Sequence, residues 1–268
     1  MKKQIFIFLL LMMSVLKMPL VMGQFSPGDI GYDPAYHKII KSNKVHQIIS
    51  VVSASTVEDF IKGDTAAIFT FAENGTPLTA KIVDLSMAEG DIILGYNWLS
   101  NGKIKSITNN GFDGEPFETK FNYMEGGRLG GTSIDGEIPR RDHYLYDLND
   151  HIIQRHGEVF QVPTDASGQP TGPAKWTPVD QDMYFWNADG TLKSAEYYSE
   201  FQLIAVVDYF YNENKSLASV YYYEDDSRSS SNGKTLFTYT KEGLPLTKEE
   251  YNGMGDLMVA YNFIIIHF

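Results

Sequence analysis

Histidine and aspartate side chains gather in one short segment, where they could bind a metal ion or transfer protons. The segment holds His143, His151, His156, Asp142, Asp147 and Asp150. If a hairpin turn centres on residues 149–150, His143 lies opposite His156, whereas a shift of one residue places Arg155 there instead. The alternative is a set of exposed histidines on a turn and two strands. We favour this alternative and assign no metal site and no catalytic residue.

Carboxylate pairs could hydrolyse glycans if two of them faced each other across a cleft. The glutamates available for this are Glu196, Glu200, Glu249 and Glu250, but no spacing brings any two together. The chain has no cysteine, which excludes thiol catalysis and thiolate metal sites. P-loop, GxSxG, HExxH and complete EF-hand patterns are absent as well. We expect no cofactor and lean against an enzyme.

Aromatic side chains are the remaining candidates for contact with a ligand. Adjacent residues of a strand face opposite sides, so the tyrosine runs 197–198 and 221–223 cannot place every ring on one face. Either both faces are covered, or some rings are exposed and available for binding. The candidate ligand-binding residues are Trp176, Tyr198, Tyr221, Tyr222 and Tyr223.

The elements that must position these residues repeat along the chain about every 25 residues, with one longer interval. Each copy has two aromatic residues at alternate positions, then a polar turn, then an aliphatic residue. The aromatic pairs are Phe69 and Phe71, Tyr96 and Trp98, Phe121 and Tyr123, Tyr144 and Tyr146, Tyr184 and Trp186, Tyr209 and Tyr211, and Phe237 and Tyr239. The aliphatic partners are Leu78, Ile104, Leu129, Ile152, Leu192, Leu217 and Leu246.

This pattern predicts an all-β fold of tandem antiparallel β-hairpins. Alternation places both aromatic residues of a copy on one face of a strand. Turn dipeptides such as Asn74-Gly75 and Asp189-Gly190 tolerate the backbone of a tight hairpin turn. About seven and a half copies would form one extended, twisted or curled meander sheet. Whether that sheet stays open, spirals or closes depends on twist and tilt, which the sequence leaves open.

At this point the chain resembles the YD-repeat proteins of Rhs type and the MORN-like hairpin repeat proteins of bacterial cell envelopes. The resemblance covers residues 64–268, although only Tyr146-Asp147 reproduces the Tyr-Asp dipeptide. It implies an exported scaffold, shell or binding surface and supplies no catalytic residue.

The ends and interruptions of the repeat suggest a domain organisation. Residues 1–23 open with Lys2 and Lys3, continue with an apolar run and end with a small residue, an order that is typical of a secretory signal peptide. The run is shorter than the roughly 20 residues of a membrane-spanning helix, so we expect no stable span after cleavage. We interpret residues 24–63 as a cap of uncertain secondary structure, 64–268 as the repeat domain and 157–181 as an insertion.

A net charge of −12 disfavours nucleic acid as a partner. The first hypothesis is therefore an exported, periplasmic, cell-surface or secreted module that binds or scaffolds a glycan or a protein. The alternatives are a glycan-acting hydrolase and an outer-membrane β-barrel. The terminal strand 264–268, which ends in phenylalanine, favours the barrel.

Overall fold

The computed structural model describes residues 34–58, 60–83, 91–110, 116–136, 138–165, 167 and 169–268. The predicted signal peptide, residues 1–23, lies outside the described residues. Within these ranges no helix has both the length and the apolar character needed to span a membrane.

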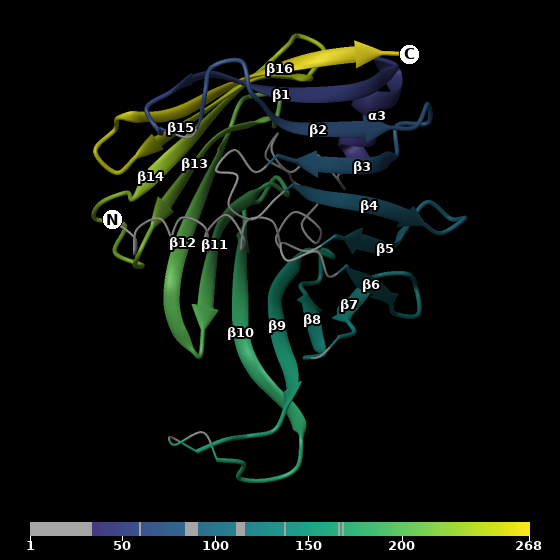
Figure 1. Cartoon of the computed structure of the whole chain (residues 1–268), viewed down its shortest axis with the longest axis vertical. Coiled ribbons are helices and arrows are strands. Elements are labelled where there is room, and N and C mark those ends of the chain that lie inside the picture. Colours follow the sequence, from purple (N-terminus) through teal and green to yellow (C-terminus); the bar gives the residue numbers. More distant parts are fainter. Residues whose placement is uncertain are drawn as a thin grey trace.

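Over the described residues the fold is one helix and an antiparallel β-meander (Figure 1). The helix is α3 (Pro34–Ser42). The strands are β1 (Val45–Ser55), β2 (Thr65–Phe71), β3 (Pro77–Ile82), β4 (Ile92–Trp98), β5 (Ile104–Asn109), β6 (Phe117–Tyr123), β7 (Leu129–Ile134), β8 (Arg140–Tyr146), β9 (Ile152–Gln161), β10 (Lys175–Trp186), β11 (Leu192–Ser199), β12 (Gln202–Tyr211), β13 (Leu217–Tyr223), β14 (Gly233–Tyr239), β15 (Pro245–Asn252) and β16 (Leu257–His267). The predicted all-β hairpin meander is confirmed.

The sheet closes into a 16-stranded barrel, which corrects the prediction of an extended or curled sheet. Closure is made by β1, which pairs antiparallel with β16 on one side and with β2 on the other. The β1–β16 register runs from Val45 opposite His267 to Ser55 opposite Val259. Residues 45–55, placed in the predicted cap, therefore form a full member of the barrel wall.

The two faces of the barrel wall differ in composition. The inner face is aromatic and aliphatic, because the first aromatic residue of each repeat points inward, as Phe69, Tyr144 and Tyr184 do. The sixth residue after the second aromatic is also buried in six of the seven copies, and Leu129 is partly buried. In two copies this residue is proline, Pro77 or Pro245. The aliphatic partners Leu78 and Leu246 follow these prolines and are exposed.

Eight turns of one geometry shape the hairpins. In the first, the N–H of Ala72 donates to the carbonyl of Thr76 and the N–H of Gly75 donates to the carbonyl of Ala72. Gly75 adopts a positive φ of 87°, as expected for a type I turn that ends in a β-bulge. Two of the eight turns place Asp150 or Lys215 at this position instead of glycine.

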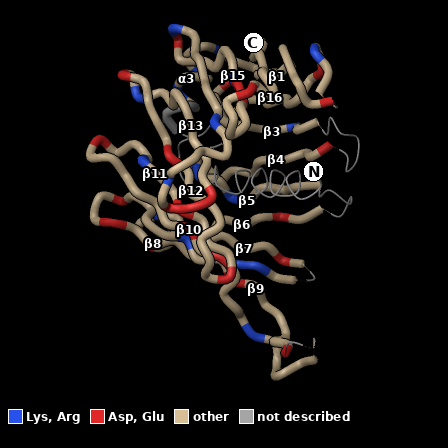
Figure 2. Tube along the Cα trace, turned by 90° about the vertical axis from the view of Figure 1, so that its left-hand side faces the viewer, with Lys and Arg blue, Asp and Glu red and all other residues tan. Residues whose placement is uncertain are grey.

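These turns give the barrel two unlike ends. Seven of them connect the strands of successive hairpins from β2–β3 to β14–β15, and together they form what we call the tight-turn end. At the opposite loop end several connections are longer, as in residues 83–91, 162–174 and 224–232, whereas β11–β12 and β15–β16 are joined there by short turns. The β9–β10 hairpin extends beyond its neighbours (Figures 1 and 2). The C-terminus lies at the tight-turn end, where the N–H of Phe268 donates to the carbonyl of Lys44.

Helix α3 packs against the tight-turn end. Its Ile40 is fully buried in a cluster with Phe71, at the end of β2, and with Leu244, in the turn between β14 and β15. The His37 ring meets the edge of Trp98 at 5.6 Å between ring centroids. Helix α3 therefore contacts both the β2–β3 hairpin and the β14–β15 hairpin. These two hairpins lie on opposite sides of the closing pair, β1 and β16.

We predict that Gly75→Ala destabilises the protein more than Gly102→Ala. Both glycines have positive φ, which costs an alanine about 1–2 kcal/mol. A methyl group at Gly75 would also collide with the carbonyl oxygen of His37, whereas one at Gly102 meets open space. Urea denaturation measures the two free energies of unfolding. Equal losses would contradict the docking of α3 on this turn.

Candidate functional site

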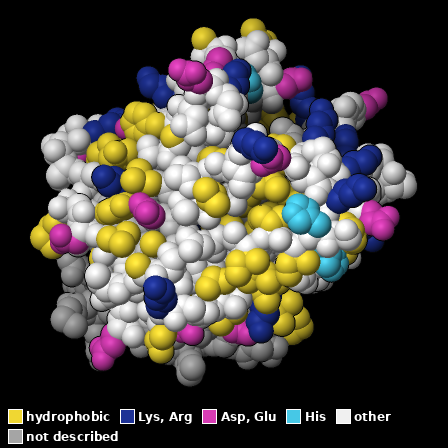
Figure 3. Space-filling model, turned by 90° about the horizontal axis from the view of Figure 1, so that it is seen from above, with side chains coloured by type: hydrophobic (Ala, Val, Ile, Leu, Met, Phe, Trp, Pro, Cys, Tyr) yellow, Lys and Arg dark blue, Asp and Glu magenta, His cyan; other side chains and the backbone are white. Residues whose placement is uncertain are grey.

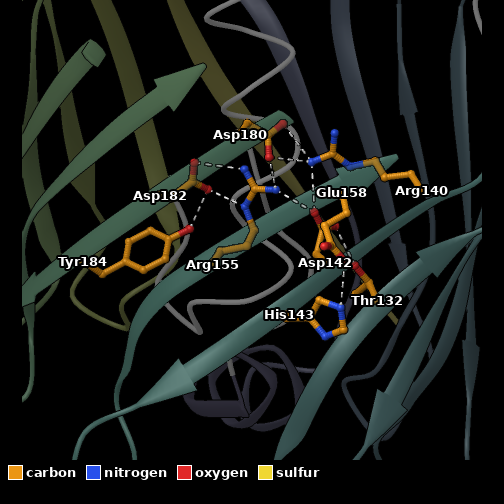
Figure 4. A network of polar contacts seen from close by, with 9 residues as sticks. All are labelled: Thr132, Arg140, Asp142, His143, Arg155, Glu158, Asp180, Asp182 and Tyr184. Carbon is orange, nitrogen blue, oxygen red and sulfur yellow. Dashed lines mark hydrogen bonds and ion pairs between the residues drawn. The ribbon is translucent and has the colours of Figure 1, made fainter. Parts of the chain in front are cut away.

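The largest set of ionisable side chains inside the barrel lies on four adjacent strands, where the repeat is interrupted (Figure 4). The residues whose side chains face inward are Thr132 on β7, Arg140 and Asp142 on β8, Arg155 on β9, and Asp180, Asp182 and Tyr184 on β10. We call this set the inner charged network. Buried ionisable groups inside a barrel are candidates for function, which makes the network the first site to examine.

Arg155 is the centre of the network and is 9% exposed. Its Nε and Nη2 donate to both carboxylate oxygens of Asp182, at 2.5 and 2.9 Å. Its Nη1 donates to Asp142 at 2.7 Å and lies 3.0 Å from Asp180. The guanidinium therefore holds one carboxylate in a two-bond fork and two more by single contacts. This geometry uses the planar group of arginine in a way that lysine could not reproduce.

Arg140 forms the second bridge and depends on a glycine. Its Nη2 lies 2.9 Å from Asp142 and 2.9 Å from Asp180, so it reaches from β8 across β9 to β10. Gly157 lies between these two aspartates in the register of the three strands. A methyl group there would collide with the Asp180 carboxylate and the Arg140 guanidinium. The absence of a side chain at 157 therefore permits the bridge.

The network holds charges in fixed positions. Two guanidinium groups and three carboxylates give it a net charge of −1. Thr132 also donates to Asp142 at 2.8 Å, and Tyr184 donates to Asp182 at 2.9 Å. Because each carboxylate accepts at least one charge-assisted bond, the arrangement locks the β8–β10 register and offers no free nucleophile or base.

The histidine and aspartate segment has the first of the two predicted registers, because His143 lies opposite His156. His143 points outward, with Nε2 3.4 Å from Glu158, whereas His151 stacks on Trp186 with ring centroids 4.6 Å apart. Asp147 accepts backbone N–H bonds from His151 and Asn149, which hold the pKa of its carboxyl below its usual range. Over the described part of the chain, no group of three such side chains could hold a metal ion.

The four candidate glutamates do not form a pair. Glu250 faces inward and pairs with Lys248 at 2.7 Å. Glu249 and Glu196 lie on the outer face, where each accepts a hydrogen bond from a tyrosine two residues along its own strand. Glu200 lies in the turn between β11 and β12. The structure therefore gives no support to the hydrolase alternative.

The five candidate aromatic residues separate into three places. Tyr198, Tyr221 and Tyr223 lie on the outer face of β11 and β13. Tyr222 faces inward and packs against the core, which removes it from any outer binding surface. Trp176 lies on the extended part of β10, where the Arg141 guanidinium is 4.2 Å from its ring centroid. It is about 16 Å along the strand from Gln181, the partner of Tyr198.

Sequence reasoning missed the inner charged network, although a signal was present. Alternation extended backwards from the inward aromatic residues Tyr184 and Tyr144 reaches Asp182, Asp180 and Asp142. The same rule that placed the aromatic rings inside therefore places three carboxylates inside.

Comparisons with known proteins give a weak likeness in fold. No family model matches the sequence, and no curated protein matches it. A porin-like protein from Bacteroides uniformis is 9% identical, with a TM-score of 0.48, over 82% of this chain and 96% of that one. A porin-like protein from Bacteroides vulgatus is 11% identical, with a TM-score of 0.40, over 71% and 98%. A chain of a TcdB2–TccC3–Cdc42 structure is 13% identical, with a TM-score of 0.31, over 74% and 12%.

The predicted resemblance to YD-repeat and MORN-like proteins is wrong. No family model of such repeats matches, and the sheet is one closed barrel rather than an open stack of hairpins. Closure supports the outer-membrane β-barrel alternative better than the binding or scaffold module.

We predict that Arg155→Met destabilises the protein by about 3–5 kcal/mol, because it leaves buried carboxylates without their counter-ion. Arg128→Met is the matched control, since Arg128 pairs with Asp150 on the exposed surface, where such a pair contributes about 0–1 kcal/mol. Chemical denaturation of both variants measures the difference. Similar losses would show that the network does not stabilise β8–β10.

Proposed function

We propose that this protein is an outer-membrane β-barrel of a bacterial cell envelope. The observation that carries the proposal is closure of an even number of antiparallel strands, which leaves no unpaired edge. Lipid offers no hydrogen bonds to a free strand edge, so a spanning sheet must close. The signal peptide predicted at residues 1–23 supplies the export that this location requires.

The unlike ends of the barrel support the same proposal. Outer-membrane barrels have short turns on the periplasmic side and longer loops outside. Here the tight-turn end carries seven turns of one geometry, together with Phe268 at the end of the chain. In this orientation the loop end, with its extended β9–β10 hairpin, faces the exterior.

Exposed apolar side chains on the outer wall near the tight-turn end would contact lipid. This group comprises Leu78, Leu145, Ile153, Phe185, Phe210, Leu246 and Ile264. The outer wall also carries charged side chains, and Figure 3 shows both kinds interspersed on the face seen from above.

A second candidate is an exported barrel that is not embedded in a membrane, and two observations favour it. Strands β2–β8 have only six or seven residues, fewer than the roughly 9–11 of a membrane strand. In addition, Glu118, Lys120 and the Arg141–Glu158 ion pair lie on the outer face. Fractionation distinguishes the candidates, since only the membrane barrel needs detergent for extraction after an alkaline wash. A periplasmic or secreted pool would contradict the first proposal.

We predict that Leu145→Arg hinders membrane insertion. Leu145 is 48% exposed on the outer face near the tight-turn end, and an arginine on the lipid face costs from about 1 kcal/mol near an interface to about 2–4 kcal/mol at the midplane. Leu148→Arg is the control, because Leu148 is fully exposed in a turn outside the wall. The amount of folded protein in detergent extracts of the outer membrane measures the effect. Equal amounts of the two variants would favour the second candidate, for which surface changes stay within about 0.5 kcal/mol.

A further inference from the structure

Outer-facing tyrosines gather on β11, β13 and β15, close to the loop end. They are Tyr198, Tyr221, Tyr223 and Tyr251, and all four are half-buried. Each lies within two residues of the loop end of its strand. We call them the tyrosine row. Tyr198, Tyr221 and Tyr223 are among the candidates predicted from the sequence. Tyr251 belongs to the same row because strand pairing places β15 two strands from β13.

Strand pairing fixes the spacing within the row. Tyr221 pairs with Lys234 of β14, and Lys234 pairs with Tyr251 of β15. Two strand spacings separate the backbones of Tyr221 and Tyr251 by about 10 Å. The Lys234 ammonium lies 4.9 Å from the centroid of the Tyr251 ring, and Phe210 meets Tyr221 edge-on at 5.4 Å. Both rings are therefore held by neighbours on their own face.

Hydrogen-bond acceptors lie beside the rings. The Tyr198 hydroxyl donates to Glu196 at 2.7 Å, and the Tyr251 hydroxyl donates to Glu249 at 2.7 Å. A carboxylate has about four acceptor positions, so each one keeps capacity for further donors. Asp208, opposite Tyr221, is paired with Arg228 at 3.0 Å. The row thus combines flat apolar surfaces with oriented acceptors.

We propose that the tyrosine row binds a neutral polysaccharide that lies across strands β11–β15. The C–H faces of sugar rings stack on aromatic rings, and sugar hydroxyls donate to carboxylates such as Glu196 and Glu249. A spacing of about 10 Å between the backbones that carry two of the rings suits alternate sugars of an extended chain. The net charge of −12 and the carboxylates beside the row, those of Glu196, Glu249 and Asp208, disfavour a polyanion as the ligand.

This inference goes beyond the proposed function and rests on the second candidate, the barrel that is not embedded in a membrane. There the outer face of the wall is in solvent, and the row is accessible. In a membrane barrel, outward-facing tyrosines near the strand ends would lie at the membrane interface instead.

Affinity electrophoresis of the full chain tests the proposal, with gels that contain dextran, xylan, galactomannan or mixed-linkage β-glucan, and alginate as the polyanion. We expect at least one neutral polysaccharide to retard the protein and alginate to have no effect. Tyr221→Ala and Tyr251→Ala should each weaken the retardation about tenfold or more, because large buried rings dominate such contacts. Tyr221→Phe keeps the ring and should bind like the parent.

Phe185→Ala is the matched control, because it removes an exposed outer-face ring from β10, outside the row. It should bind like the parent, and circular dichroism confirms that each variant is folded. The proposal is overturned if no neutral polysaccharide retards the parent, if alginate alone does so, or if folded tyrosine variants bind like Phe185→Ala. The alkaline-wash fractionation locates the barrel independently, so a failure of binding and a failure of the proposed function are distinguishable.

Discussion

The pairing of β1 with β16 is the constraint on which the rest of the structure depends. Without it, both strands would present a row of unpaired backbone groups, which invites aggregation. The closing pair joins residues near the two ends of the described chain, so it encloses every intervening hairpin in one ring. Closure also gives the wall an inner face, which separates the inner charged network from the outer tyrosine row. A bulge between Val52 and Ala54 bends β1 at this seam.

Inside the barrel, ion pairing is added to aromatic packing at β8–β10. Strands β8 and β10 contribute aromatic rings to the inner face as the other repeats do, and before those rings they also carry charged side chains inward. Arg155 and Arg140 link the three strands across their hydrogen-bonded ladders. Breaking such a pair is costly, although a buried ion pair adds little stability relative to apolar packing. The network is therefore better understood as fixing the register of the longest hairpin than as a source of net stability.

Much of the wall could be predicted from sequence, because its rules are local. Alternation placed Phe69, Tyr144 and Tyr184 inward, and the turn dipeptides located the hairpins. The turn at 149–150 placed His143 opposite His156. Closure could not be predicted, since it depends on strand tilt and on a pairing between residues more than 200 positions apart. Residues 45–52 fit a helix or a strand equally well, and only the partner strand β16 decides between them. In two copies Pro77 and Pro245 occupy the inward position that an aliphatic residue holds in the other copies, which the repeat pattern alone does not indicate.

A disulfide cross-link between β1 and β16 tests the closed barrel most directly, because the chain has no cysteine of its own. Ile49 and Ile264 are register partners, so the double variant Ile49→Cys/Ile264→Cys should form an intramolecular disulfide on mild oxidation. The control, Ile49→Cys/Thr108→Cys, places the second thiol on β5, four strands away from β1. A rapid intramolecular cross-link in the first variant alone is the result that closure predicts. No cross-link in the folded protein, or equal cross-linking of both variants, would contradict it.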